Sequence, residues 1–229
     1  MKRIILILFI LFSVSILAKE KYIICLDPGH QTKGNPELEE IAPNSDKKKA
    51  KVTTGTRGVV TKKYESELML EIALKLKTSL ENKGYKVIMT RTKNDVDISN
   101  KERAIFANDN KADVYIRLHA DGSENKNASG ASVLTSSPKN KYTTKVQKES
   151  EEFSKILLEE YVKATGVKNR GLIYRDDLTG TNWATVPNTL IELGFMSNAE
   201  EDKKLSEKDY QDKIVKGLVN GIERYLGGK

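Results

Sequence analysis

Short apolar segments alternate with longer, amphipathic segments along most of the chain. Apolar runs of strand length occupy residues 22–26, 85–89, 114–118, 131–134, 172–174 and 189–193. Between them, apolar side chains recur at helical spacing over residues 65–83, 99–107, 145–164 and about 207–226. Runs of the first kind are typical of buried strands, and segments of the second kind are typical of helices. This order predicts a single α/β domain with a mixed, mostly parallel sheet of about six strands, flanked by helices on both faces.

Residues 31–60 interrupt this alternation. They are polar, rich in Gly, Thr and Lys, and show neither period, so the sequence predicts a long loop. A loop of this length in a compact domain is usually functional or mobile. The helix after residue 99 has a clear start, because Ser99 and Glu102 have the spacing of a capping box.

The N-terminal segment differs from the rest of the chain. Lys2 and Arg3 precede the apolar residues 4–17, and Ala18 precedes a charged stretch. The run is shorter than the ~20 residues that span a bilayer, and its three-part layout is that of a secretory signal. We therefore expect a signal peptide over residues 1–18 and one catalytic domain over 19–229, with a retained membrane anchor as the alternative. Export places the protein in a periplasm, in the cell wall or in the medium.

Charge and cysteine content narrow the function classes. The chain has 39 Lys and Arg against 32 Asp and Glu, and its net charge of +7 falls to +5 without Lys2 and Arg3. Outside the membrane such a charge attracts the carboxylates and phosphates of cell-wall polymers, so we expect no nucleic-acid partner. A single cysteine, Cys25, excludes an internal disulfide framework and cysteine-rich zinc or iron–sulfur sites. Cys25 lies in an apolar run and is expected to be a small buried hydrophobe.

The chain has two histidines, and each follows a predicted strand. His30 comes after residues 22–26, and His119 comes directly after residues 114–118. Glu192 stands inside the apolar run 189–193, where an unpartnered carboxylate would be costly. In open α/β sheets the binding crevice lies beyond the carboxyl ends of the strands. These three side chains, which can bind a metal or move protons, are therefore expected to meet in one region.

Glu65 is the fourth candidate, at the start of a predicted helix. A carboxylate there also stabilises the positive end of the helix dipole, which would be reason enough for its presence. Two histidines, one glutamate and water form a known catalytic zinc arrangement, and these ligands suit zinc better than calcium or magnesium. Glu192 is then either a further ligand or the general acid/base.

Several motifs recur in one order along the chain. They are Leu26-Asp27-Pro28-Gly29-His30, Glu65 ahead of Leu68-Met69-Leu70, Arg117-Leu118-His119-Ala120-Asp121-Gly122 and Ile191-Glu192-Leu193-Gly194-Phe195-Met196-Ser197-Asn198. Shorter ones are Thr90-Arg91, Asn100-Lys101-Glu102-Arg103-Ala104 and Gly180-Thr181-Asn182-Trp183. In order and spacing the sequence resembles the zinc-dependent N-acetylmuramoyl-L-alanine amidases, a family of cell-wall amidase catalytic domains. The resemblance covers nearly all of residues 19–229.

The resemblance implies a zinc ion held by His30, Glu65 and His119, with Glu192 as the catalytic glutamate. It implies a hydrolase acting on peptidoglycan, at the amide that joins the lactyl group of N-acetylmuramic acid to L-alanine. The fold it implies is a mixed six-stranded sheet flanked by helices, in agreement with the pattern above.

Some residues depart from the commonest family pattern. Gln31-Thr32-Lys33 stands where many relatives carry more glycine, and an insertion at about residues 35–54 lengthens the loop before Glu65. Arg117 stands where a small residue is common. It shares a strand face with His119, and it could serve an active-site carboxylate or a developing oxyanion. A structural ion pair with Asp27 or Asp113 is the alternative.

Two other functions stay open from the sequence alone. A metal-independent peptidoglycan glycosidase would use paired carboxylates, for example Asp27 and Glu192. A non-catalytic wall-binding module would keep the basic surface without using the two histidines. We expect no appended wall-binding module, and therefore only weak wall attraction and dependence on a protein partner, an activator or recruiter. Membrane contact is expected only through the signal segment before its cleavage.

Overall fold

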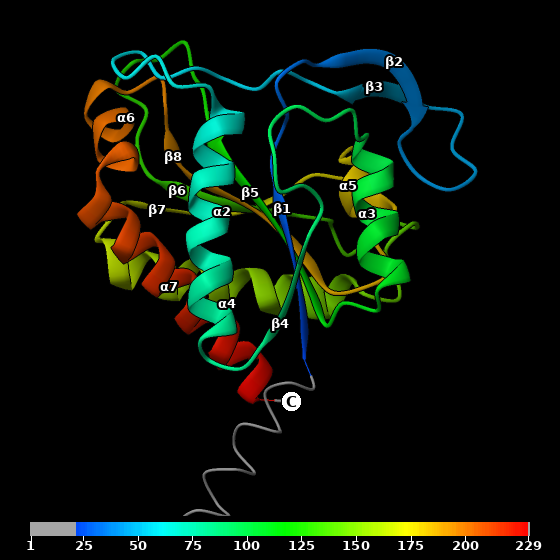
Figure 1. Cartoon of the computed structure of the whole chain (residues 1–229). Coiled ribbons are helices and arrows are strands. Elements are labelled where there is room, and N and C mark those ends of the chain that lie inside the picture. The colour runs from blue at the N-terminus through cyan, green and yellow to red at the C-terminus, as the bar shows by residue number, and fades with distance from the viewer. Residues whose placement is uncertain (1–21, 229) are drawn as a thin grey trace, which may run out of the picture.

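Six strands form the central sheet of the computed structural model, which describes residues 22–228 (Figure 1). They are β1 (Ile23–Pro28), β4 (Lys86–Met89), β5 (Val114–Asp121), β6 (Ala131–Thr135), β7 (Asn169–Tyr174) and β8 (Asn188–Phe195). Their order is β4-β1-β5-β8-β6-β7, and every neighbouring pair is parallel except β6 with β8. The predicted mixed, mostly parallel sheet is therefore confirmed. The predicted signal segment, residues 1–18, lies outside the described residues.

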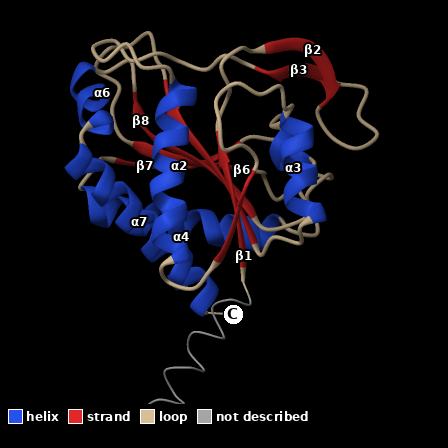
Figure 2. Cartoon of the chain, in the orientation of Figure 1, coloured by secondary structure: helices blue, strands red, loops and turns tan. Residues whose placement is uncertain are grey.

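Helices pack on both faces of this sheet, as predicted (Figure 2). They are α2 (Glu65–Glu81), α3 (Asn100–Asp109), α4 (Gln147–Thr165), α5 (Thr179–Asn182), α6 (Ala199–Ser206) and α7 (Lys208–Gly227). The capping box of α3 is present, since the Ser99 hydroxyl accepts from the Glu102 amide at 3.1 Å and Glu102 Oε2 accepts from the Ser99 amide at 2.7 Å. The sequence pattern did not predict α5 and α6, because both are short and polar.

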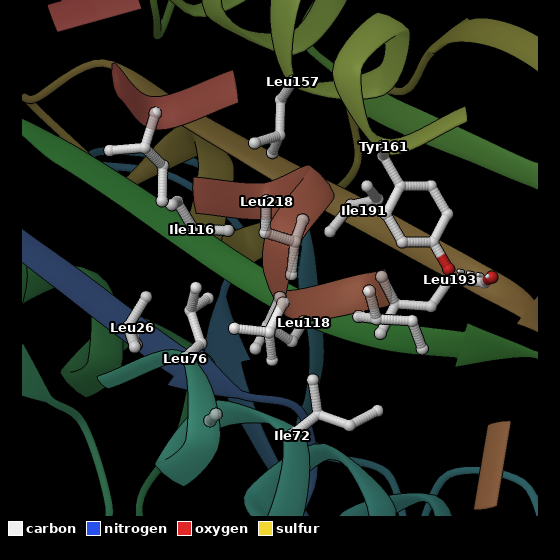
Figure 3. Close-up of a cluster of buried hydrophobic side chains, with 14 of the residues drawn as sticks. Leu26, Ile72, Leu76, Ile116, Leu118, Leu157, Tyr161, Ile191, Leu193 and Leu218 are labelled. Atoms are coloured by element: carbon white, nitrogen blue, oxygen red, sulfur yellow. Dashed lines mark hydrogen bonds between the residues drawn. The ribbon is translucent and has the colours of Figure 1, made fainter. Parts of the chain in front are cut away.

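Alternation along the strands divides the interior into two sides. Leu26, Leu118 and Ile191 face the larger core, which α2, α4 and α7 cover (Figure 3). Because successive side chains of a strand point to opposite faces, the intervening residues face α3 and α5. Cys25 lies on this second side, buried as predicted, and burial raises the pKa of its thiol. The polar residues Asp27, Arg117, His119 and Glu192 belong to the same side by this alternation.

The segment 31–60 is not the structureless loop that its polarity predicts. It contains the antiparallel hairpin of β2 (Asn35–Glu40) and β3 (Lys48–Val52), drawn at the upper right above α3 in Figure 1. Pairing across the hairpin satisfies the backbone N–H and C=O groups without any alternation of apolar residues. This explains why the sequence of residues 31–60 shows no strand period. Hydrogen bonds to the main domain hold the hairpin in place, among them the one that Trp183 Nε1 donates to the Glu40 carbonyl at 2.9 Å.

Among residues 22–228, none of the helices combines the length and the apolar composition needed to cross a membrane.

Candidate active site

Three side chains from distant parts of the sequence meet at the carboxyl ends of the parallel strands. His30 follows β1, Glu65 is the first residue of α2, and His119 lies on β5. Their potential ligand atoms all lie within 4.8 Å of one another. Glu65 Oε1 is 3.1 Å from His30 Nε2 and 3.0 Å from His119 Nδ1. The structure thus brings together the three residues that the sequence proposed as metal ligands.

The carboxylate of Glu65 is held in place from both sides. Its Oε1 accepts a hydrogen bond from the Ala120 amide at 3.1 Å, and its Oε2 accepts one from the Thr56 amide at 2.9 Å. Burial alone would raise the pKa of Glu65, but the hydrogen bonds and charges of His119 and His30 hold it well below its usual range. Glu65 is therefore an anion at neutral pH, the form in which a carboxylate binds a metal.

Each histidine is arranged to leave a lone pair for a ligand. His30 Nδ1 donates to the Thr53 carbonyl at 2.7 Å, so in the neutral tautomer of this ring the lone pair is on Nε2, 3.1 Å from Glu65 Oε1. Burial lowers the pKa of His119 to about 4, so its imidazole is neutral near pH 7. His119 Nε2 is buried and has no hydrogen-bond partner among residues 22–228. The other ring nitrogen, Nδ1, is the one beside the carboxylate, 3.0 Å from Glu65 Oε1. A neutral imidazole next to an anionic carboxylate fits a site for a metal cation.

Two glycines allow this close packing. A Cβ atom at Gly29 would lie 2.5 Å from His119 Cε1, and a Cβ atom at Gly55 would lie 2.7 Å from Glu65 Oε2. Neither distance is possible for a real side chain. The backbone itself therefore forms part of the wall against which the three candidate ligands pack.

Glu192 stands beside this cluster on β8, in register with His119 on β5. Its Oε2 is buried without a hydrogen-bond partner in the described part of the chain. Burial, followed by the negative charges of Glu65 and Asp121, raises the pKa of Glu192 well above its ordinary value. A carboxyl group in such a place keeps its proton to higher pH than an exposed glutamate does, a property that suits a general acid/base.

Arg117 makes the structural ion pair that the sequence left open. Its Nε is 3.2 Å from Asp27 Oδ2, while Arg103 Nη1 is 2.8 Å from Asp27 Oδ1. Burial would raise the pKa of Asp27, but these two guanidinium charges and the Thr90 hydroxyl hold it well below its usual range. Asp113 takes a different partner, since its Oδ2 accepts from the Ile23 amide at 2.7 Å.

Two hollows open on either side of the candidate ligands, and His30, His119 and Glu192 line both. The loop-side hollow has a volume of about 600 Å³, and its walls are residues 55–59 and 120–124. The hairpin-side hollow has a volume of about 440 Å³ and is lined by three cationic side chains: Lys49, Arg117 and Arg175. The two hollows share His30, His119 and Glu192 in their linings, so both reach the candidate ligands.

Sequence reasoning missed the backbone and arginine contacts that shape the site. Nothing in the pattern of residues 31–60 indicated that the Thr53 carbonyl and the Thr56 amide would contact the candidate ligands. Arg91 and Arg103 belong to motifs of the resemblance, but no role followed for them from the sequence.

Comparison with known proteins shows the family of this chain. The Amidase_3 family, described as N-acetylmuramoyl-L-alanine amidase, matches residues 24–224. The chain belongs to this amidase family. The match contains all four candidate site residues, and it confirms the resemblance read from the motifs.

Two amidases and one amidase complex show how far the likeness extends. A germination-specific N-acetylmuramoyl-L-alanine amidase of Bacillus subtilis is 28% identical over 221 residues, covering 90% of this chain and 81% of the relative. The crystal structure of the amidase Ami1 from Mycobacterium smegmatis superimposes with a TM-score of 0.82 at 25% identity, covering 92% of this chain and 99% of that one. CwlD of Clostridioides difficile, solved with the GerS lipoprotein, gives a TM-score of 0.72 at 25% identity, over 91% of this chain and all of that one (100%).

The chain is shorter than some amidases that it matches. It spans about half the length of two AmiC amidases, 48% of the Escherichia coli protein and 52% of the Neisseria meningitidis protein. Those two relatives therefore contain further sequence outside the shared amidase domain.

Proposed function

We propose that this chain is a zinc-dependent N-acetylmuramoyl-L-alanine amidase. It hydrolyses the peptidoglycan amide that joins N-acetylmuramic acid to L-alanine. The observation that carries the proposal is the convergence of His30, Glu65 and His119 within 4.8 Å, in a chain that belongs to the amidase family.

The three side chains would hold the metal. Two imidazoles and one carboxylate form a donor set that suits zinc, and a site with three protein ligands leaves a position for substrate. When bound, zinc supplies Lewis acidity, which polarises the scissile carbonyl and acidifies water. The Thr53 carbonyl on His30 Nδ1 and the amides on Glu65 then keep these ligands oriented.

Glu192 would move the protons. Its carboxylate takes a proton from the attacking water as the oxygen bonds to the amide carbon, and it returns that proton to the nitrogen of L-alanine as the C–N bond breaks. The products are a lactyl carboxylic acid and a peptide with a free amino terminus, so the reaction consumes one water.

The charges in the two hollows suggest how the substrate lies. The leaving group is a peptide and ends in a carboxylate, whereas the glycan strand is built from neutral sugar rings. In the hairpin-side hollow, Lys49 and Arg175 carry two positive charges but share one negative partner, Asp177, so one positive charge is in excess. Arg117 lines the same hollow. We place the peptide in the hairpin-side hollow and the glycan in the loop-side hollow on this basis.

The two rival functions fit the structure less well. A glycosidase using Asp27 and Glu192 would need Asp27 to reach substrate, but Asp27 is 0% exposed and accepts bonds from Arg103, Arg117, Thr90 and Tyr115. A non-catalytic wall-binding module gives no reason for the orphaned atoms of His119 and Glu192.

The place of action and the partners follow from the substrate. Peptidoglycan lies outside the cytoplasmic membrane, so we propose export through the predicted signal segment to a periplasm or cell wall. A protein activator or recruiter is consistent with the CwlD complex, in which the relative is bound to a lipoprotein.

Metal analysis of ligand variants tests the proposal. His119→Ala should lose stoichiometric zinc and amidase activity together, and chelation of the wild type should abolish activity that zinc restores. Full zinc occupancy in His119→Ala would refute the ligand assignment, and activity that survives chelation would favour a glycosidase.

A further inference from the structure

Two buried guanidinium groups hold the turn that carries His30. Arg91 Nε donates to the Pro28 carbonyl at 2.9 Å, and its Nη2 donates to the Gly29 carbonyl at 2.9 Å. Arg103 donates to the Pro28 carbonyl at 2.9 Å and to the His30 carbonyl at 3.0 Å. Three successive carbonyl groups at the end of β1 are thus satisfied by arginines from outside the strand.

This turn needs such support. His30 has a φ of 59°, in the left-handed region that residues with a Cβ rarely adopt. That conformation is unfavourable for an L-residue and persists only where the surroundings impose it. The strained backbone determines where the imidazole of His30 lies.

Arg91 does more than hold one turn. Its Nη2 also donates to the Ser66 carbonyl at 2.7 Å. Gly29 precedes His30 and Ser66 follows Glu65, so one nitrogen atom joins the backbone beside two of the three candidate ligands. The opposite end of the guanidinium is held by Asn94, whose Oδ1 accepts from Arg91 Nη1 at 3.1 Å.

The partners of Arg91 distinguish it from an ordinary buried ion pair. Arg103 forms a salt bridge with Asp27 at 2.8 Å, whereas Arg91 makes no salt bridge within residues 22–228. Every acceptor of Arg91 within residues 22–228 is a carbonyl or amide oxygen, although Arg91 is only 3% exposed. Burying an arginine charge without a carboxylate is costly. A stabilising ion pair therefore does not account for this residue.

We propose that Arg91 is a positioning residue that sets the separation of His30 and Glu65 before the metal binds. The inference rests on the proposed metal ligands and concerns a residue that touches neither metal nor substrate. Lysine cannot replace it, because an ammonium group lacks the planar array of N–H donors with which a guanidinium binds several carbonyls at fixed angles.

Zinc affinity and cobalt spectroscopy of Arg91→Lys test this role. We expect zinc to bind 10–100-fold more weakly, the usual effect of losing a group that orients metal ligands. The visible spectrum of the Co²⁺-loaded variant should also differ from that of the wild type, because the coordination geometry changes. Leu218→Ala serves as the control, since it opens a cavity in the core under α7 without touching the turn (Figure 3). It should lower the melting temperature and leave zinc affinity and the cobalt spectrum unchanged.

Each outcome decides the question. A folded Arg91→Lys with wild-type zinc affinity and cobalt spectrum overturns the inference, as does an equal loss of affinity in Leu218→Ala. If Arg91→Lys does not fold, Asn94→Ala takes its place, because it loosens the same guanidinium without removing it. An unchanged affinity and spectrum in Asn94→Ala would then overturn the inference. Wild-type protein that binds neither zinc nor cobalt would instead refute the proposed metal ligands themselves.

Discussion

Replacing Glu192 with glutamine separates proton transfer from metal binding. Glutamine has nearly the same shape as glutamate, so the substitution opens no cavity. Glu192 Oε2 has no hydrogen-bond partner among the described residues, so no bond of that atom is lost. The change therefore removes the ability to carry a proton and little else.

The size of the effect follows from the role assigned to the carboxyl. A general acid/base typically contributes about 10²–10⁴-fold to the rate. At about 1.36 kcal/mol for each factor of ten, this corresponds to roughly 2.7–5.4 kcal/mol of transition-state stabilisation. We expect Glu192→Gln to lose that much in kcat, while KM changes little and one zinc per chain remains bound.

The free energy of unfolding of metal-free Glu192→Gln should not fall with its activity. Burial and the charges of Glu65 and Asp121 raise the folded-state pKa of Glu192, so the folded protein binds more protons than the unfolded chain above about pH 4.3. Stability that depends on this proton falls as the pH rises through the folded-state pKa. Metal-free Glu192→Gln should therefore be at least as stable as the wild type at pH 7, and the difference should shrink toward pH 4.

Steady-state kinetics on purified peptidoglycan, zinc analysis and urea unfolding at several pH values measure these three effects. Turnover close to that of the wild type would refute the acid/base role. Loss of zinc in the variant would show instead that Glu192 is a ligand.

Three further predictions concern other parts of the molecule. Asp27→Asn leaves Arg103 and Arg117 unpaired and should cost about 3–5 kcal/mol in urea unfolding at pH 7. Because the folded-state pKa of Asp27 is depressed, this contribution exists above about pH 3.9 and disappears as the pH falls further. The gap between Asp27→Asn and wild type should thus close in acid, whereas the exposed Asp46→Asn should change little at any pH. Lys49→Ala breaks an exposed ion pair worth about 0–1 kcal/mol, so the melting temperature of the variant should barely change. Its KM for peptide-bearing fragments should rise. An unchanged KM would contradict the placement of the peptide in the hairpin-side hollow. Binding to purified wall should be weak and lost at high salt, because the Debye length is about 8 Å at physiological ionic strength; binding that survives molar salt would reveal a specific wall site.

The sheet and the site were predictable from the sequence to different degrees. Apolar runs indicated all six strands of the central sheet. The signal is strongest for β1, β5, β6 and β8, which are buried on both faces, and weakest for the edge strand β7, which has no fully buried residue. His30, His119 and Glu192 could be brought together in advance, since the ends of parallel strands meet at one edge. The pattern alone could not identify Glu65 as a candidate ligand, because a glutamate at the start of a helix is explained equally well by the helix dipole. The need of two histidines for a third ligand identified it.

What the sequence did not reveal depends on backbone and tertiary contacts. The β2–β3 hairpin has no alternating apolar face, so its pairing leaves no periodic trace in residues 35–52. The Thr53 carbonyl and the Thr56 amide act through main-chain atoms that every residue has. The choice of Asp27 as the partner of Arg117 depended on strand register, in which the two residues are paired neighbours on β1 and β5.

Mass spectrometry of peptidoglycan fragments tests the central claim most directly. Purified peptidoglycan is incubated with zinc-loaded protein, with Glu192→Gln as the matched control. The account predicts stem peptides with a free L-alanine amino terminus and glycan strands whose lactyl groups carry a free carboxylic acid, each cleavage adding one water. Fragments that keep the stem peptide on N-acetylmuramic acid and show new reducing sugar ends would contradict it.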